Sequence, residues 1–142
     1  MGSTQIRIVL EDPNVMRFVR YLGAFKVVEG DLGLFDELAK AKDIEQFVTV
    51  INKFLRVKDR VIEKLAKGIE ENEYTVPAFS EEKVEAKSTL ERVRKVFDVG
   101  SDTIKRVLEL AEHNPRLIAT VISSLALAYS GVREVEKKTS RR

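Results

Sequence analysis

The chain has 142 residues, 44% of them hydrophobic, which suffices for one domain with its own core. Lys and Arg outnumber Asp and Glu by only 25 to 23, so a nucleic-acid role would depend on where the cations lie. The chain has no cysteine, which excludes disulfides and thiolate chemistry, and no signal peptide follows Met1, so we expect a cytoplasmic protein.

The first part of the chain predicts an arm followed by two helices. Residues 6–10 alternate between apolar and polar, as in a strand, but no partner strand is evident. We therefore expect residues 1–11 to form an extended arm or an early helical turn. Asp12-Pro13 is a strong helix start, and apolar residues follow at helical spacing as far as Phe25. A short second helix is expected over residues 32–42.

The longest predicted helix runs from Ile44 to Ile69, with Asp43 as its cap. Its apolar residues keep a three-to-four spacing that would bury one face. The opposite face carries five cations that, at about 100° per residue, share one narrow arc and form a row about 20 Å long. We call them the basic stripe: Lys53, Arg56, Arg60, Lys64 and Lys67. Such a row suits the phosphates of a strand, but it is also typical of a solvated helix face, here with Asp59 and Glu63 alongside.

The middle of the chain predicts a polar connection and two further helices. Residues 68–79 are mostly polar and include Val76-Pro77, where a helix is disfavoured. Ser80 is expected to cap a fourth helix that runs as far as Phe97, and a fifth helix should follow Gly100-Ser101. Three cations on the outer face of the fourth helix form what we call the second basic patch: Arg92, Arg94 and Lys95.

The last predicted helix, residues 117–129, carries no charge on any face. Asn114 can cap it, Pro115 suits its first turn, and Gly131 follows its end. A helix that is apolar all round is normally buried, so we expect this one to be the central rod of the fold. Residues 132–142 would then be a frayed basic tail.

These elements predict an all-α protein. We expect a single-domain bundle of about six helices over residues 1–142, built around the buried C-terminal helix. That helix has only 13 uncharged residues, well short of the roughly 20 that cross a bilayer, so we expect no membrane association.

The sequence carries no recognisable catalytic machinery. His113 is the only histidine, so a histidine pair for a metal is impossible. Nearly all carboxylates sit beside a lysine or arginine, as in surface ion pairs. Gly30 and Gly33 lack the spacing of a phosphate-binding loop. We therefore expect no enzyme, no metal and no cofactor.

Three segments carry a family resemblance: DLGLFDELAKAKDIEQFVTVINKFLR (31–56), VPAFSEEKVEA (76–86) and SLALAYS (124–130). Together they resemble the small subunit of archaeal type I-A CRISPR interference (Cascade) complexes. The composition, rich in Glu, Lys, Val and Ile and poor in Asn and Gln, agrees with a heat-adapted source.

This resemblance implies an all-α, non-enzymatic protein that stacks in several copies along a guide-RNA complex and contacts its other subunits. In such complexes the guide pairs with one DNA strand, while protein surfaces hold backbones and the displaced strand. The partners would be CRISPR RNA and target DNA. The family offers no invariant nucleic-acid site to carry over, so the candidate positions come from charge geometry alone.

We therefore expect the basic stripe and the second basic patch to contact phosphates without choosing among bases. One alternative is a helical adaptor or scaffold protein without nucleic-acid binding, in which the same cations only solvate the surface. Another is a small regulator that binds duplex DNA. The last two helices superficially suggest a helix-turn-helix, but the second of them is too apolar to read base edges.

Overall fold

The computed structural model describes residues 2–82, 85–129 and 131–136, and the side chains of residues 6–80, 85–129 and 131–136. The helices are α1 (Gly2–Glu11), α2 (Pro13–Glu29), α3 (Gly33–Ala39), α4 (Ile44–Arg56), α5 (Lys58–Glu70), α6 (Ala78–Glu82), α7 (Thr89–Phe97), α8 (Ser101–His113) and α9 (Pro115–Ala128). Two short strands, β1 (Tyr74–Thr75) and β2 (Arg133–Glu134), make a small antiparallel sheet. The predicted all-α class is confirmed.

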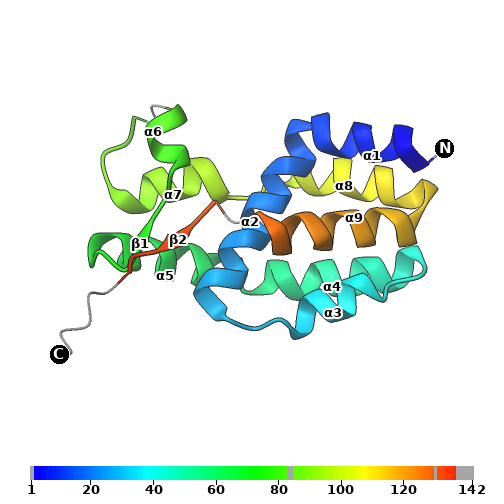
Figure 1. Cartoon of the computed structure of the whole chain (residues 1–142), viewed down its shortest axis with the longest axis horizontal. Coiled ribbons are helices and arrows are strands. Elements are labelled where there is room, and N and C mark those ends of the chain that lie inside the picture. The colour runs from blue at the N-terminus through cyan, green and yellow to red at the C-terminus, as the bar shows by residue number, and fades with distance from the viewer. Residues whose placement is uncertain (1, 83–84, 130, 137–142) are drawn as a thin grey trace.

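The central helix is α2, which lies between two groups of helices (Figure 1). It packs against α1, α8 and α9 on one side and against α5 and α7 on the other. Asp12 caps it as predicted, because its carboxylate accepts hydrogen bonds from the backbone N–H groups of Asn14 and Val15. Gly30, with a left-handed φ of 66°, ends it. Its buried residues are Val15, Phe18, Val19, Tyr21, Leu22, Gly23, Ala24 and Phe25.

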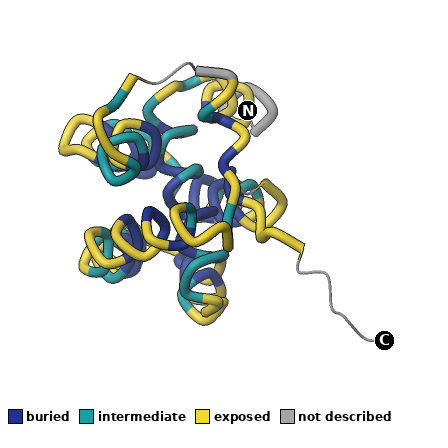
Figure 2. Tube along the Cα trace, turned by 90° about the vertical axis from the view of Figure 1, so that its left-hand side faces the viewer, coloured by how far each residue is buried: buried dark blue, intermediate teal, exposed yellow. Residues whose placement is uncertain are grey.

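The interior forms one apolar cluster that every long helix helps to build. Figure 2 shows the buried residues where the helices face one another and the exposed ones around the outside. Three rings from α2, α3 and α4 meet edge to face, with Phe54 centred 4.9 Å from Phe25 and 5.2 Å from Phe35. In the part of the chain that the structure describes, no helix is both long enough and apolar enough to cross a bilayer.

The uncharged helix α9 does not occupy the centre of the fold. Its cap is as predicted, since the Asn114 side chain accepts a hydrogen bond from the Leu117 N–H at 3.1 Å. It is buried where it meets α1, α2, α3, α4 and α8, but Thr120, Ser124 and Leu127 are exposed. The prediction of a rod buried on all sides is therefore wrong. The longer α2, with its three aromatic residues, lies at the centre of the fold instead.

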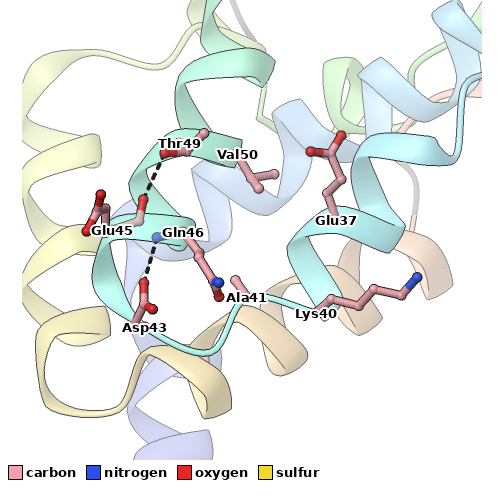
Figure 3. Close-up of a pocket in the computed structure, with 8 residues that line it drawn as sticks. All are labelled: Glu37, Lys40, Ala41, Asp43, Glu45, Gln46, Thr49 and Val50. Atoms are coloured by element: carbon pink, nitrogen blue, oxygen red, sulfur yellow. Dashed lines mark hydrogen bonds between the residues drawn. The ribbon is translucent and has the colours of Figure 1, made fainter.

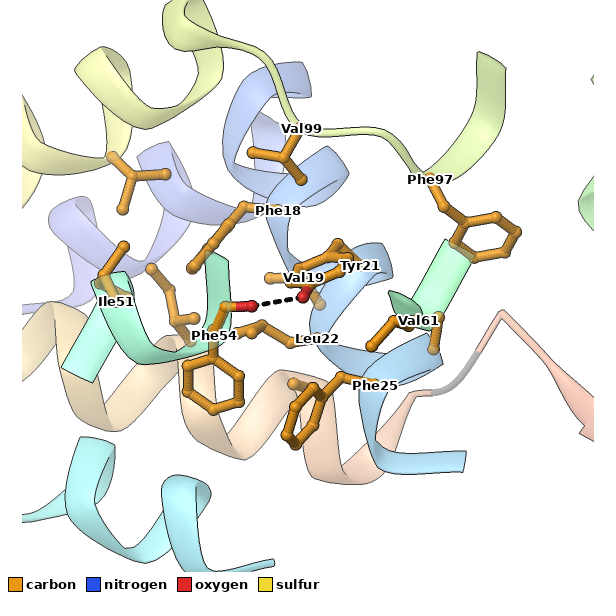
Figure 4. Packing of buried hydrophobic residues seen from close by; sticks show 14 of the residues in the cluster. Phe18, Val19, Tyr21, Leu22, Phe25, Ile51, Phe54, Val61, Phe97 and Val99 are labelled. Atoms are coloured by element: carbon orange, nitrogen blue, oxygen red, sulfur yellow. Dashed lines mark hydrogen bonds between the residues drawn. The ribbon is translucent and has the colours of Figure 1, made fainter. Parts of the chain in front are cut away.

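The predicted long helix from Ile44 to Ile69 is broken at Val57, whose φ of −104° and ψ of 11° leave the helical region. Its first part, α4, packs against α3, α8 and α9, whereas α5 packs against α2 and α7. A helix end leaves its last carbonyl groups without helical partners. The buried Tyr21 hydroxyl donates a hydrogen bond to one of them, the Phe54 carbonyl (Figure 4). Tertiary contacts therefore stabilise a break for which the local sequence gives no signal.

The described residues near both ends of the chain include elements that the sequence left open. Of the two alternatives for residues 1–11, an extended arm or an early helical turn, the structure shows a helix over residues 2–11: α1 packs on α2 and α9 and buries Val9. Within the expected frayed tail over residues 132–142, Arg133 pairs with Thr75 across the small sheet. The Val135 N–H also donates to the Glu73 carbonyl, at 2.9 Å. Residues 137–142 lie outside the described residues.

The fourth predicted helix is also divided. Ser80 lies inside the short α6 rather than capping the helix, and the cap of α7 is Ser88, whose hydroxyl accepts a hydrogen bond from the Glu91 N–H at 3.1 Å.

The end of α5 packs against β1, where the Tyr74 ring lies directly on Gly68. A Cβ atom at Gly68 would stand 2.3 Å from that ring, so only glycine fits there.

Candidate nucleic-acid interface

The basic stripe is shared between two helices. Lys53 and Arg56 belong to α4, and the other three cations belong to α5. The prediction of a single row of five cations on one continuous helix is therefore wrong. Within α5, Arg60, Lys64 and Lys67 still fall in one arc, because their spacings of four and three residues return to the same face. All three are exposed.

Two cations of α5 converge on one carboxylate from the end of α2. The Arg60 guanidinium lies 2.6 Å from Glu29 and the Lys64 ammonium lies 3.2 Å from it. Both cationic side chains remain 54% exposed, whereas Glu29 is only 11% exposed. Burial alone would raise the pKa of Glu29, but the hydrogen bonds from Arg60 and Lys64 outweigh it and lower that pKa below its ordinary value. Glu29 therefore stays ionised and holds the two cations side by side.

The remaining stripe cations differ in their surroundings. The Lys53 ammonium lies 2.7 Å from Glu37 of α3, in an exposed ion pair. Arg56 and Lys67 are exposed, and among the described side chains neither has an acidic partner. Three of the five stripe cations are thus already paired with acids, which removes part of the positive charge that the sequence suggested. Asp59 and Glu63, exposed beside the arc on α5, reduce it further.

The second basic patch lies on α7, which packs directly against α5. Arg94 and Lys95 are exposed, and the Lys95 ammonium lies 3.2 Å from Glu91 on the same helix. Arg92 differs because its guanidinium stacks on the Phe79 ring, 4.4 Å from the ring centre, and its Nε atom is buried. Arg92 therefore fixes α6 to α7, and only Arg94 and Lys95 face solvent.

Sequence reasoning missed two residues that shape this surface. Glu29 positions Arg60 and Lys64 across a separation of 31 and 35 residues. Arg17 of α2 donates hydrogen bonds of 2.6 Å to the carbonyls of Lys95 and Asp98, and so caps the C-terminal end of α7. Both contacts join distant segments, so the spacing of residues along the chain does not predict them.

A groove of about 510 Å³ lies between α3 and α4 (Figure 3). Its polar groups hold the helix ends. The Asp43 carboxylate caps α4 by accepting from the Gln46 N–H at 2.8 Å, and the Thr49 hydroxyl donates to the Glu45 carbonyl at 2.9 Å. Among the described residues, no group of three or more His, Cys, Asp or Glu side chains is arranged to hold a metal ion. The groove therefore presents helix caps, and the exposed cations of α5 and α7 are the better candidate for a binding surface.

Comparison with protein-family models, curated proteins and solved structures finds no match for the chain. The functional argument therefore depends on the residues and their geometry. Of the eight predicted site residues, the fold brings Arg60 and Lys64 together at Glu29, and places Arg94 and Lys95 on the helix next to them.

Proposed function

We propose that this protein is a non-catalytic small subunit of a CRISPR RNA-guided antiviral complex of type I-A. In this proposal it works in the cytoplasm of a heat-adapted archaeon and packs against the other subunits of the complex. Its own contribution is to hold nucleic-acid backbone, either of the guide and target or of the displaced strand. The family resemblance of the sequence supports the complex, and the cations of α5 support the contact with backbone.

The observation that carries the proposal is the cluster of three exposed cations on one arc of α5: Arg60, Lys64 and Lys67. Glu29 orders two of them from behind while more than half of each cationic side chain stays open to solvent. Cations that are held in place lose less conformational freedom when they bind a phosphate. The cluster therefore suits backbone contact better than isolated, freely rotating lysines.

The ion pairs of the stripe do not prevent phosphate binding. The exposed pair of Lys53 with Glu37 contributes only about 0–1 kcal/mol. Glu29 is mostly buried, but the Arg60 and Lys64 side chains that it pairs with stay 54% exposed. A backbone phosphate presents two charged acceptor oxygens, and condensed counterions leave the strand when it is neutralised. Arg60 and Lys64 can thus bind a phosphate while keeping Glu29 as a shared partner on their other side.

The neighbouring helix extends the surface. Because α5 and α7 pack together, Arg94 and Lys95 lie on the helix next to the α5 cluster and offer a second point of contact along a strand. All these groups are point or fork-shaped donors that suit phosphates, and phosphate contacts carry no sequence information. Binding would therefore be independent of sequence, as a guide-directed complex requires.

The experiment is a salt titration of binding to labelled single-stranded DNA and RNA, measured by fluorescence anisotropy. The triple variant Arg60→Glu, Lys64→Glu, Lys67→Glu should bind at least about tenfold more weakly. It should also lose about 2 from the slope of log K against log salt, at about 0.7 for each lost contact.

The matched control carries the same charge change on exposed lysines elsewhere in the fold: Lys40→Glu, Lys42→Glu and Lys105→Glu. Both variants should keep the far-ultraviolet circular dichroism of the wild type. Equal binding by the two variants, or unaltered binding by the α5 variant at low salt, would refute the α5 site.

The alternative function is a helical adaptor that does not bind nucleic acid. The observation in its favour is that Lys53, Arg60 and Lys64 already have acidic partners. The same titration separates the two functions. An adaptor would show no affinity for strands that weakens steeply with salt.

A further inference from the structure

The ring of Tyr74 lies at the end of the α5 cation cluster. β1 runs beside the C-terminal end of α5 (Figure 1), and the Tyr74 ring packs there against Gly68. Gly68 comes four residues after Lys64, which is about 6 Å along the axis and on the same side of α5. The ring therefore follows the cations along the helix.

Only one edge of this ring is covered by α5. A Cβ atom at Gly68 would stand 2.3 and 2.4 Å from the Cδ2 and Cε2 atoms of Tyr74, but 3.5 Å from its Cγ atom. The ring thus meets the helix with one edge, and its faces are turned away from Gly68. The half-buried ring also lines a hollow of about 550 Å³ at the small sheet, together with Glu73, Glu134, Val135 and Glu136.

We propose that Tyr74 stacks on an unpaired base of a single strand while the cations of α5 hold the phosphates of the same strand. Aromatic side chains are the usual platforms for single strands, because every base has a π-face. A base inside a duplex is stacked on its neighbours and does not offer that face. The inference rests on the proposed function for the strand itself and adds which form of nucleic acid the surface takes.

The other aromatic rings of the α5 half are covered. Phe97 is only 1% exposed. The Phe79 ring carries the Arg92 guanidinium, 4.4 Å from its centre. Within α5, α6, α7 and the small sheet, as far as the structure describes them, Tyr74 is therefore the ring that a base can reach.

The charges around the ring separate the two parts of a nucleotide. The carboxylates of Glu73, Glu134 and Glu136 line the hollow, and their negative charge keeps phosphates out of it. The neutral base is not repelled, and base amino groups can donate hydrogen bonds to carboxylates. The cations of α5 attract the phosphates instead. A strand bound here would thus lay its backbone over α5 and turn a base towards Tyr74.

The Tyr74 phenol is neutral when it stacks. Burial raises its pKa above the ordinary value, and the negative charges of three glutamates raise that pKa further: Glu73, Glu134 and Glu29. Glu29 is the residue that holds two cations of the α5 cluster. The ring and those cations therefore share one carboxylate neighbour, as contact with a single nucleotide requires.

The test compares a strand that has bases with a strand that lacks them. The first is a deoxycytidine strand of about 12 nucleotides, and the second is an abasic strand of the same length with the same phosphates. Fluorescence anisotropy at low salt and neutral pH should show that wild type binds the first at least about fivefold more tightly. Tyr74→Leu keeps an apolar side chain against Gly68 but cannot stack, so it should lose this preference. Tyr74→Phe keeps the ring and should retain it.

The matched control is Tyr129→Leu, which makes the same change at a tyrosine that is 47% exposed at the end of α9. It should keep the preference of the wild type. Equal binding of the two strands by wild type would overturn the inference, as would a preference that Tyr74→Leu retains. A tetra-arginine peptide that binds wild type but not Tyr74→Leu, with no preference between the strands, would also overturn it and assign the hollow to a basic protein segment.

The abasic strand separates this inference from the proposed function. Its binding depends on the cations alone, so the triple variant of α5 should lose it and Tyr74→Leu should keep it. Unaltered binding of the abasic strand also shows that Tyr74→Leu is folded. Wild type that binds both strands equally would keep the α5 site and lose the stacking site. Wild type that binds neither strand would overturn both.

Discussion

The helices on the two sides of α2 share one apolar core, but they carry different surface contacts. On one side α1, α3, α4, α8 and α9, which we call the α9 half, share apolar packing that includes the ring cluster of Phe25, Phe35 and Phe54. On the other side α5, α6, α7 and the small sheet form the α5 half. There, polar contacts between distant segments supplement the core. Arg17 caps α7, and Lys58 lies 3.1 Å from Asp98.

This difference separates structural support from the candidate binding surface. Apolar packing between long helices gives the α9 half a large share of the hydrophobic stabilisation. The α5 half carries the ordered cations. Its polar contacts orient helix ends and side chains, and each of them contributes less to the free energy of unfolding than a buried apolar side chain does. Substitutions of buried apolar residues should therefore cost much more stability than substitutions of these polar contacts.

The largest expected effect is that of Phe54→Ala in the ring cluster. Removing this fully buried ring leaves a cavity between α2, α3 and α4, so the free energy of unfolding should fall by about 3–5 kcal/mol. Urea unfolding followed by circular dichroism measures it. Phe79→Ala in the α5 half should cost markedly less, because that ring is only partly buried. Equal losses would show that the stacking of Arg92 on Phe79 contributes as much as burial in the ring cluster.

Within the α5 half, Gly68→Ala should have the next largest effect. The added methyl group would overlap the Tyr74 ring, which would have to move away from α5. A loss of about 1–3 kcal/mol in the free energy of unfolding is expected from such overpacking. Tyr74→Ala in the same background should make the glycine substitution nearly neutral, and a persistent loss in the double variant would contradict the steric cause.

Arg17→Met tests the contact between α2 and the end of α7. Methionine keeps the apolar stem but removes the donors to the Lys95 and Asp98 carbonyls. The expected loss is about 1 kcal/mol, as for other helix caps. Hydrogen exchange should show faster exchange at the C-terminal end of α7 with α8 and α9 unchanged. Uniform acceleration throughout the chain would mean that Arg17 supports the whole fold.

The smallest effect should come from Glu29→Gln, and it should depend on pH. Since the folded state lowers the pKa of Glu29, ionisation of this group stabilises the fold at neutral pH. That contribution is present above the unfolded pKa of about 4.3 and is lost as the pH falls towards the lower folded value. Urea unfolding should therefore show a deficit for the variant at pH 7 that shrinks below about pH 4. The control, Glu112→Gln on the exposed face of α8, should show no such trend.

Sequence reasoning located the features that depend on neighbouring residues. Asp43 and Asn114 were predicted as helix caps and Asp12 as part of a helix start, and all three are caps, because a cap needs only a side-chain oxygen two or three residues before a free N–H. Ser80 was wrongly predicted as a cap, since it lies inside α6. The all-α class followed from helical spacing of apolar residues in the same way.

The features that sequence reasoning missed depend on contacts between distant segments. The break at Val57 accompanies a hydrogen bond from Tyr21, 33 residues before Phe54. The ordering of two stripe cations depends on Glu29 in another helix. The central place given to α9 was wrong because lack of charge describes one helix alone, whereas burial depends on which helices surround it. The binding role of the cations stays a prediction.

The small sheet has a consequence for the order in which the chain folds. Because Thr75 pairs with Arg133, the intervening chain forms a closed loop that contains α6, α7, α8 and α9. Two-residue strands contribute too little to offset the entropy of closing so long a loop by themselves, so they can meet only once those helices have packed. The helices α6 to α9 therefore pack first, and the small sheet that completes the α5 half forms after them.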